Sequence, residues 1–457
     1  MCLSLQRQGL HIRIFSSLIL VILTWPLLGI AQIERISVTG GGGQADSDSY
    51  NAQLSDDGSV IVFRSNAENL IADDTNGWSD VFVHDLNAGT VERVSVLTDG
   101  SQSSRFSTHP SISDDGQLIV FEGRPTSNVA WPTLYDRSDD SVLQPLPRLA
   151  SGSTAAGPQR ARNEPQISGN GQFLLFHTWA TLQNLFDTDA RPLNDDSNSA
   201  DDVFVFDLTA QPIAAVERVS RDSSGNSVDG DSLSGSLSDD GRYVAFFSYT
   251  NELVPNDLNG HEDVFLKDRD TGTIDLVSVS TSGAPGNEDS YNPMVSGNGQ
   301  FIVFRSLAND LVTGDSNNSW DIFVRDRNAQ VTQRVSVSSA GQGGDNHSFE
   351  GSISDDGRYV TFRSAASNLV ADDANGRFDI FVHDRTRSLT ERISAGIAAE
   401  ADGNSFEPAI SGDGRWIVFE SDATNLVAGD SNQARDIFRA PNPLFEAGGN
   451  QDTEAAR

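Results

Sequence analysis

Seven near-equal internal repeats constrain this chain more than any other feature of its sequence. The tetrapeptide Ser-Asp-Asp-Gly, or a close variant, recurs with its glycine at positions 58, 116, 171, 241, 299, 357 and 414. The successive spacings are 58, 55, 70, 58, 58 and 57 residues. Self-similarity at a fixed period is typical of solenoids, propellers and other repeat architectures. The sequence of 457 residues therefore predicts one repeat domain rather than several unrelated domains.

Each repeat predicts four short strands. In the sixth repeat, residues 350–353 form a first strand and the Ser-Asp-Asp-Gly turn follows it. Residues 358–362, 379–382 and 390–394 form the second, third and fourth strands. An Asp-Gly or Asn-Gly turn between alternating apolar stretches is a strong hairpin signal. Four antiparallel strands repeated seven times predict an all-β fold, a seven-bladed β-propeller.

The two ends of the repeat array predict how the ring closes. The seventh repeat reaches its third strand at 436–438 and then runs into Pro441 and Pro443 without a fourth strand. Residues 34–38, Glu-Arg-Ile-Ser-Val, match the fourth strand at 92–96, Glu-Arg-Val-Ser-Val. We therefore expect the N-terminal strand to complete the last blade, which leaves no exposed sheet edge there.

A phenylalanine recurs in two of the predicted strands and indicates the core. In the second strand it stands at positions 63, 121, 176, 246, 304, 362 and 419. In the third strand it stands at positions 82, 204, 265, 323, 381 and 438. We expect these rings to fill the space between blades rather than to bind a ligand.

The repeat resembles a known family. Residues 354–360, Ser-Asp-Asp-Gly-Arg-Tyr-Val, and 379–385, Asp-Ile-Phe-Val-His-Asp-Arg, are similar to the TolB-type, WD40-like (PD40) β-propeller repeat of bacterial periplasmic proteins. The resemblance extends over nearly all of the chain after its N-terminal segment. It implies a propeller fold and an exported protein, and it does not specify an activity.

The N-terminal segment predicts export. Arg7 and Arg13 precede an apolar stretch at 14–30, and small residues up to Ala31 suit a cleavage site. We expect residues 1–31 to be a signal peptide, 32–443 the propeller and 444–457 a disordered polar tail. The expected location is periplasmic or extracellular. The single cysteine, Cys2, lies in the signal peptide, so the mature protein would contain no disulfide.

The charge of the chain excludes some partners. Lys and Arg number 31 and Asp and Glu number 65, which gives a net charge of −34. Such a surface repels the phosphates of nucleic acid and anionic lipid headgroups. No segment after residue 31 is apolar enough to span a bilayer. We therefore expect neither nucleic-acid binding nor membrane insertion after cleavage.

A loop motif, Asp-x-Asn-x-x-x-Asp, recurs between the second and third strands of six repeats. Its instances are Asp74, Asn76 and Asp80; Asp196, Asn198 and Asp202; Asp257, Asn259 and Asp263; Asp315, Asn317 and Asp321; Asp373, Asn375 and Asp379; and Asp430, Asn432 and Asp436. Two interpretations remain open. The side chains either form Asx-turns that fix the loop, or they supply hard oxygen ligands to calcium.

The first strands of a propeller line its central channel, which gives a second candidate site. The residues four positions before each turn serine are Asn51, His109, Glu164, Ser234, Asn292, Glu350 and Glu407. His109 with Glu164, Glu350 and Glu407 could hold a metal or act as acid and base. Propeller lyases similar to TolB hold their metal with several histidines, whereas this set contains one. The alternative is a hydrated polar tunnel.

The second repeat departs from the pattern and gives a third candidate site. It lacks the Asp-x-Asn loop and is rich in proline and arginine. The candidate partner-binding residues are Arg124, Trp131, Arg137, Arg148, Arg160 and Arg162. Arginine beside tryptophan suits an acidic protein or an acidic sugar. The alternative is sequence drift, with the arginines paired to neighbouring aspartates.

These observations predict a function class without naming a ligand. The chain contains no Gly-x-Ser-x-Gly nucleophile elbow. The main hypothesis is an exported, non-enzymatic propeller that binds a protein or a cell-surface glycan or acts as a scaffold. The alternative is a metal-dependent polysaccharide lyase or hydrolase with its site at the central channel.

Overall fold

The computed structural model describes residues 32–123, 131–143, 164–178, 200–210 and 216–446. The chain from Ile33 onward forms one compact unit. Within the described ranges it contains only β-strands, arranged in seven four-stranded antiparallel sheets. Among these same residues no helix has the length and apolarity needed to cross a membrane. The predicted all-β, seven-bladed propeller is confirmed.

Six blades consist of four strands in sequence order, and the last blade takes β1 as its fourth strand. The first strands are β2 (Ser49–Leu54), β6 (Thr108–Ile112), β10 (Gln166–Ile167), β14 (Ser232–Leu237), β18 (Ser290–Val295), β22 (Ser348–Ile353) and β26 (Ser405–Ile410). The second strands are β3 (Val60–Ser65), β7 (Leu118–Gly123), β11 (Phe173–Thr178), β15 (Tyr243–Ser248), β19 (Phe301–Ser306), β23 (Tyr359–Ser364) and β27 (Trp416–Ser421).

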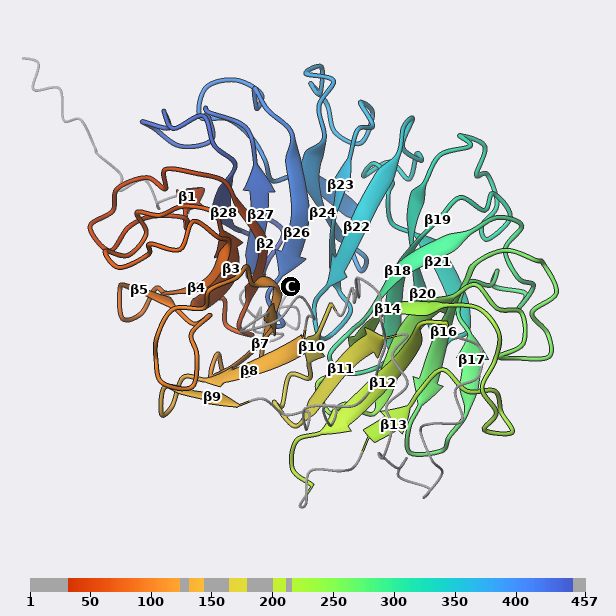
Figure 1. Ribbon diagram of the computed structural model, residues 1–457. Helices are drawn as coiled ribbons and strands as arrows, with labels where there is room; N and C mark the ends of the chain where they lie inside the picture. The colour runs from red at the N-terminus through yellow and green to blue at the C-terminus, as the bar shows by residue number, and fades with distance from the viewer. Residues whose placement is uncertain (1–31, 124–130, 144–163, 179–199, 211–215, 447–457) are drawn as a thin grey trace, which may run out of the picture. The chain divides into compact units, whose positions relative to one another are not determined.

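The outer half of each blade follows the same order. The third strands are β4 (Asp80–Asp85), β8 (Trp131–Asp136), β12 (Asp202–Asp207), β16 (Asp263–Asp268), β20 (Asp321–Asp326), β24 (Asp379–Asp384) and β28 (Asp436–Pro441). The fourth strands are β5 (Thr90–Arg93), β9 (Ser141–Leu143), β13 (Val216–Arg218), β17 (Ile274–Leu276), β21 (Val331–Arg334), β25 (Leu389–Arg392) and β1 (Glu34–Arg35). Figure 1 shows the blades around a ring, with first strands near its centre and β5, β9, β13 and β17 at its periphery.

The N-terminal strand closes the last blade, as the sequence predicts. The sheet order is β1-β28-β27-β26, with Glu34 opposite Arg439 and Arg35 opposite Phe438. The contact continues past the strand, where the Ile36 amide donates to the Ile437 carbonyl at 2.8 Å. The first and last described segments of the propeller are therefore held in one sheet.

The recurrent phenylalanines form the core, also as predicted. In six blades the two rings are direct cross-strand partners, as Phe362 and Phe381 are. Their ring centroids lie 5.6–6.1 Å apart in stacked pairs. All of these rings are buried. The second blade is the exception, because Thr133 stands opposite Phe121 there.

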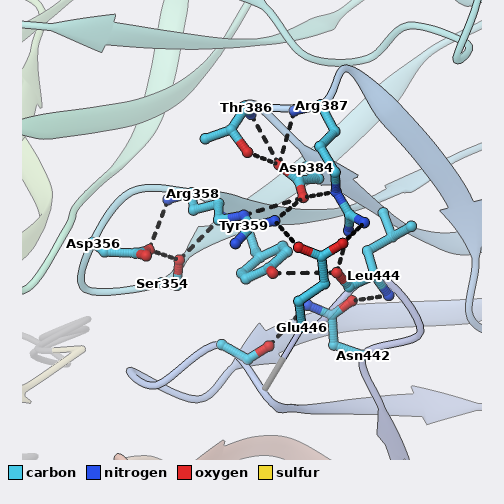
Figure 2. A network of polar contacts seen from close by, with 11 residues as sticks. Ser354, Asp356, Arg358, Tyr359, Asp384, Thr386, Arg387, Asn442, Leu444 and Glu446 are labelled. Atoms are coloured by element: carbon cyan, nitrogen blue, oxygen red, sulfur yellow. Dashed lines mark hydrogen bonds and ion pairs between the residues drawn. The ribbon is translucent and has the colours of Figure 1, made fainter. Parts of the chain in front are cut away.

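The segment after β28 folds back on the sixth blade (Figure 2). The Tyr359 hydroxyl donates to the Leu444 carbonyl at 3.2 Å, and Arg387 forms an ion pair with Glu446 at 2.6 Å. Asn442 accepts a hydrogen bond from the Leu444 amide at 2.9 Å. Residues 444–446 therefore contact the propeller, while the remainder of the expected tail, 447–457, lies outside the described residues together with the expected signal peptide.

Candidate functional site

One residue in the first strand of every blade, or two residues before it in the third blade, has a left-handed backbone, at the position that the sequence singled out. These residues are Asn51 (φ 51°), His109 (51°), Glu164 (24°), Ser234 (44°), Asn292 (51°), Glu350 (56°) and Glu407 (46°). In six blades the strand register shifts at this point. Such a bulge redirects a side chain, and left-handed non-glycine residues are strained and occur most often at functional sites.

All seven of these residues line one cavity on the propeller axis. The cavity has a volume of about 270 Å³, and its wall also includes Gln53, Gln166 and Met294. The seven positions that the sequence analysis assigned to the channel therefore lie around one cavity. Carboxylate, amide, imidazole and hydroxyl groups alternate around the wall, so the cavity is polar.

On one side of the cavity the carboxylates bind the neighbouring blade. Glu350 forms an ion pair with Arg363 at 2.9 Å and accepts a hydrogen bond from the Glu407 amide at 2.8 Å. Glu407 accepts one from the Asn51 side chain at 3.2 Å. Glu420, on β27, accepts one from the Asn51 amide at 2.5 Å. These contacts join three successive blades.

On the other side the predicted acid–base residues stay apart. His109 Nδ1 lies 3.7 Å from a carboxylate oxygen of Glu122, its neighbour on β7. Glu164 accepts a hydrogen bond from Ser234 at 3.0 Å. Across the described part of the chain, no three His, Cys, Asp or Glu side chains are grouped so as to hold a metal. His109 and Glu164 therefore contact different partners, Glu122 and Ser234.

Two glutamates at the cavity titrate near neutral pH. Burial, followed by the charge of Glu407, raises the pKa of Glu350 to about 7. The same two causes raise the pKa of Glu420 to about 7. Removing a carboxylate from water disfavours its charged form, and a second carboxylate nearby adds to that effect. Each group can therefore accept or donate a proton at physiological pH.

An arginine–aromatic belt runs across four blades, and several of its aromatic residues directly precede a cavity-lining residue in the chain. Arg64 lies over Tyr50 and Arg435 over Tyr50 and Phe406. Going round the ring, Arg363 lies over Phe406, Phe349 and Phe378, and Arg305 over Phe349, Tyr291 and Trp320. The distances from guanidinium carbon to ring centroid are 4.0–5.6 Å. Cation–π contacts of this kind fix the orientation of the guanidinium groups.

Arg305, like Arg64, differs from the two other arginines of the belt. Arg363 and Arg435 form ion pairs with Glu350 and Glu420. Among the described residues Arg305 has no ion pair, and its Nε atom is buried without a hydrogen-bond partner. Burial lowers its pKa, while the charge of Glu350 opposes that effect. A guanidinium beside a polar cavity and without a carboxylate partner is suited to bind an anionic group.

A second ring of acidic residues occurs where the first strands end, and sequence reasoning missed it. The first aspartate of the turn is Asp56, Asp114, Asp239 or Asp355 in four blades, and glycine replaces it at positions 169, 297 and 412 in the other three. Main-chain hydrogen bonds of 2.9–3.3 Å connect these turns from blade to blade around the axis. A Cβ at each of the three glycines would meet an aspartate carboxylate of this ring.

These aspartates repel one another. Burial and the charges of the other three raise the pKa of Asp355 to about 8. The same two kinds of cause raise the pKa of Asp114 to about 7 and that of Asp239 to about 6. The alternation of aspartate and glycine in the turn motif was visible in the sequence. It indicates that an aspartate side chain at one turn needs the space that a glycine leaves at a neighbouring turn.

The Asp-x-Asn loops have the geometry of Asx-turns. In the first blade the Asn76 side-chain oxygen accepts from the Trp78 amide at 2.7 Å. Its amide nitrogen donates to Asp80 at 3.0 Å and to the Ser103 carbonyl at 2.9 Å. Asn259, Asn317, Asn375 and Asn432 make the same three contacts. Asp196 and Asn198 lie outside the described residues.

The second-blade candidate site falls largely outside the described residues, which omit Arg124, Arg148, Arg160 and Arg162. Arg137 is described, and its guanidinium forms ion pairs with Asp85 at 2.9 Å and Glu92 at 3.0 Å. It also donates to the Gly116 carbonyl at 2.9 Å. Arg137 is thus engaged in holding blades one and two together. Trp131 begins β8, opposite Gly123.

Comparison with known proteins shows the fold and leaves the family open. No family model and no curated protein sequence matches this chain. A solved oligogalacturonate lyase in complex with manganese is similar, with a TM-score of 0.53 at 14% identity over 91% of this chain and 94% of that one. The oligogalacturonate lyase of Vibrio parahaemolyticus gives 0.50 at 9% identity over 91% of each chain.

TolB structures are also among the neighbours. TolB from Acinetobacter baumannii gives a TM-score of 0.42 at 14% identity, over 80% of this chain and 67% of that one. At these identities the likeness to the two lyases shows a shared propeller fold alone.

Proposed function

We propose that this protein is an exported, non-enzymatic binding module that takes the end of a glycan into its axial cavity. The supporting observation is the ring of seven residues with a left-handed backbone that surround this cavity. Their amide, carboxylate and hydroxyl groups suit the many hydroxyls of a sugar. A volume of about 270 Å³ is near the lower limit of small-molecule pockets. A cavity of this size suits a terminal sugar or a branch sugar better than a polysaccharide chain that runs through the channel.

Arg305 supports an acidic sugar as the group that is bound. Three aromatic rings hold its guanidinium beside Glu350, and no described carboxylate pairs with it. A sugar carboxylate would supply the missing partner through charge-assisted hydrogen bonds. The net charge of −34 opposes a polyanion. The proposed ligand therefore has an isolated acidic residue at or near its end.

The alternative, a metal-dependent lyase or hydrolase, has weaker support. One neighbouring fold is an oligogalacturonate lyase in complex with manganese. Glu350 and Glu420 have pKa values near 7, which would suit proton transfer. Against this, His109 is held beside Glu122 rather than beside the other channel glutamates. The described channel residues do not form a metal-binding group.

The experiment is a glycan-array screen of the exported chain, followed by calorimetric titration of the ligand found. Arg305→Ala and Glu350→Gln should each weaken binding at least about tenfold, since each removes a charged or hydrogen-bonding anchor. Glu391→Gln, at an exposed position of the outer strand β25, is the matched control and should bind like the wild type.

Several outcomes would contradict the proposal. Capture of a protein instead of any glycan would make the cavity a protein-docking site. Equal binding by the wild type, Arg305→Ala and Glu350→Gln would place the ligand elsewhere on the propeller. Formation of unsaturated products from oligogalacturonate with added manganese would favour the lyase.

A further inference from the structure

A guanidinium bridges the two loop aspartates in several blades. In the fifth blade the Arg334 Nη1 atom lies 2.8 Å from Asp315 and 3.3 Å from Asp321. The sixth blade repeats this arrangement, with Arg392 between Asp373 and Asp379 at 3.3 and 3.6 Å. The side chains of these aspartates are at most 5% exposed, so the arginine neutralises charge that is largely shielded from water.

An arginine occupies the same position in three further blades. Arg35 lies 3.2 Å from Asp430 and 3.5 Å from Asp436 in the last blade. Arg93 lies 3.6 Å from Asp74 in the first blade, and Arg218 lies 3.3 Å from Asp202 in the third. Each of these arginines stands opposite the core phenylalanine of the third strand.

The fourth blade has lost this cation. Leu276 occupies the arginine position, opposite Phe265 in the same register. Pro285 stands where the first blade has Gln102, whose side chain donates to Asp74 at 2.5 Å. The ion pair from arginine and the hydrogen bond from glutamine are therefore both missing in the fourth blade, because leucine and proline have no side-chain donor.

The two aspartates of the fourth blade are nevertheless retained and buried. Asp257 is 1% exposed and Asp263 is 0% exposed. Both carboxylate oxygens of Asp257 are buried without a hydrogen-bond partner. Asp263 accepts from Ser278 and from Asn259. Burial and the charge of Asp263 raise the pKa of Asp257 to about 7. A buried, uncompensated carboxylate is costly, so the pair requires either a shared proton or a cation.

We propose that a calcium ion binds in the fourth blade between Asp257 and Asp263, in the place that a guanidinium fills in the fifth, sixth and seventh blades. A single nitrogen spans the corresponding two carboxylates of the fifth blade, so one positive centre can contact both. Calcium prefers oxygen ligands and tolerates irregular geometry. Two carboxylates supply at most four of the six to eight oxygen ligands that calcium takes, so the affinity is modest, with a Kd of about 10⁻⁴–10⁻³ M as in extracellular calcium modules.

This site is independent of the proposed glycan site. It lies in the loop between β15 and β16, whereas the axial cavity is lined by the first strands. It also limits the calcium interpretation to one of the six loops. In the five other blades the described arginine already contacts at least one loop carboxylate.

The test is calorimetry on the exported chain at pH 8, with calcium titrated after removal of metal by EDTA. The wild type should bind one calcium ion per chain. Its Tm should rise by about 1–3 °C at ten times the Kd. Leu276→Arg restores the guanidinium and Asp257→Asn removes the unpaired charge, so both variants should lose calcium binding. If one of these two variants does not fold, the other still tests the proposal.

A matched variant tests the reasoning in the opposite direction. Arg334→Leu gives the fifth blade the arrangement of the fourth and should create a second calcium site, with a stoichiometry of two. Absence of calcium binding in the wild type would overturn the proposal and favour a proton shared by Asp257 and Asp263. Undiminished binding in both Leu276→Arg and Asp257→Asn would also overturn it, since the ion would then lie elsewhere.

Discussion

The ring of turn aspartates predicts that Asp355→Asn stabilises the protein in alkaline solution and not in acid. The pKa of Asp355 is raised from 3.8 to about 8 by burial and by the charges of three other aspartates. The folded state therefore retains a proton that the unfolded chain releases between about pH 4 and pH 8. Stability falls as the pH rises through this range. Asparagine cannot ionise, so the variant escapes that loss.

The size of the effect follows from proton linkage. One pKa unit corresponds to about 1.4 kcal/mol, so a shift of about four units gives an upper limit of about 5–6 kcal/mol above pH 8. The Asp355 side chain is partly exposed, so solvent screening reduces this limit. We expect a stabilisation of about 1–3 kcal/mol at pH 8.5 and less than about 1 kcal/mol at pH 5.5.

The assay is equilibrium unfolding in urea with EDTA present, at pH 5.5 and pH 8.5, for wild type and variant. Asp229→Asn serves as the control, because it removes one exposed carboxylate and changes the net charge equally. The reasoning is refuted if Asp355→Asn stabilises the protein equally at both pH values, or if it destabilises the protein at pH 8.5. An equal pH-dependent gain in Asp229→Asn would attribute the effect to net charge alone.

Three further substitutions test the fold. Arg35→Ala leaves the buried Asp430 carboxylate without its ion pair and should cost about 3–5 kcal/mol of folding free energy. Calorimetry with limited proteolysis would detect a last blade from which β1 has separated, and an unchanged Tm would contradict this role of β1. Phe362→Ala removes a fully buried ring and should cost about 3–5 kcal/mol in urea unfolding, a loss below about 1 kcal/mol being inconsistent with its packing. Gly357→Ala should prevent or severely weaken folding, because the position has φ 71° and a Cβ would collide with Phe301; a soluble variant of normal Tm would refute this.

The sequence predicted features that depend on local pattern and period. The repeated turn glycines located the blades, the match between 34–38 and 92–96 located the closing strand, and the recurrent phenylalanines located the core. Each of these is a short motif whose position within one repeat determines its role. The seven channel residues could be identified for the same reason, since they share a fixed distance from the turn.

Features that arise between blades were not predicted. Arg305 stacks on Phe349 of the next blade, a contact that depends on how two sheets pack. The left-handed backbone of residues such as Glu350 also has no local signature, because glutamate rarely adopts it. The loss of arginine at Leu276 was readable in an alignment of the repeats. Its consequence for the buried loop aspartates could be recognised only from the ion pairs of the other blades, which the structure shows.

The closing strand has a consequence for the order in which the molecule can fold. The Arg439–Glu34 contact joins residues 405 positions apart, whereas neighbouring blades are joined across about one repeat. Loop-closure entropy grows only with the logarithm of length, so this long closure costs about 2 kcal/mol more than a contact across one repeat. The long closure therefore delays folding more than it lowers the stability of the folded state. β1 is synthesised long before β28, the strand with which it pairs. Until the two strands pair, β28 presents an unpaired edge to which another chain could add a strand.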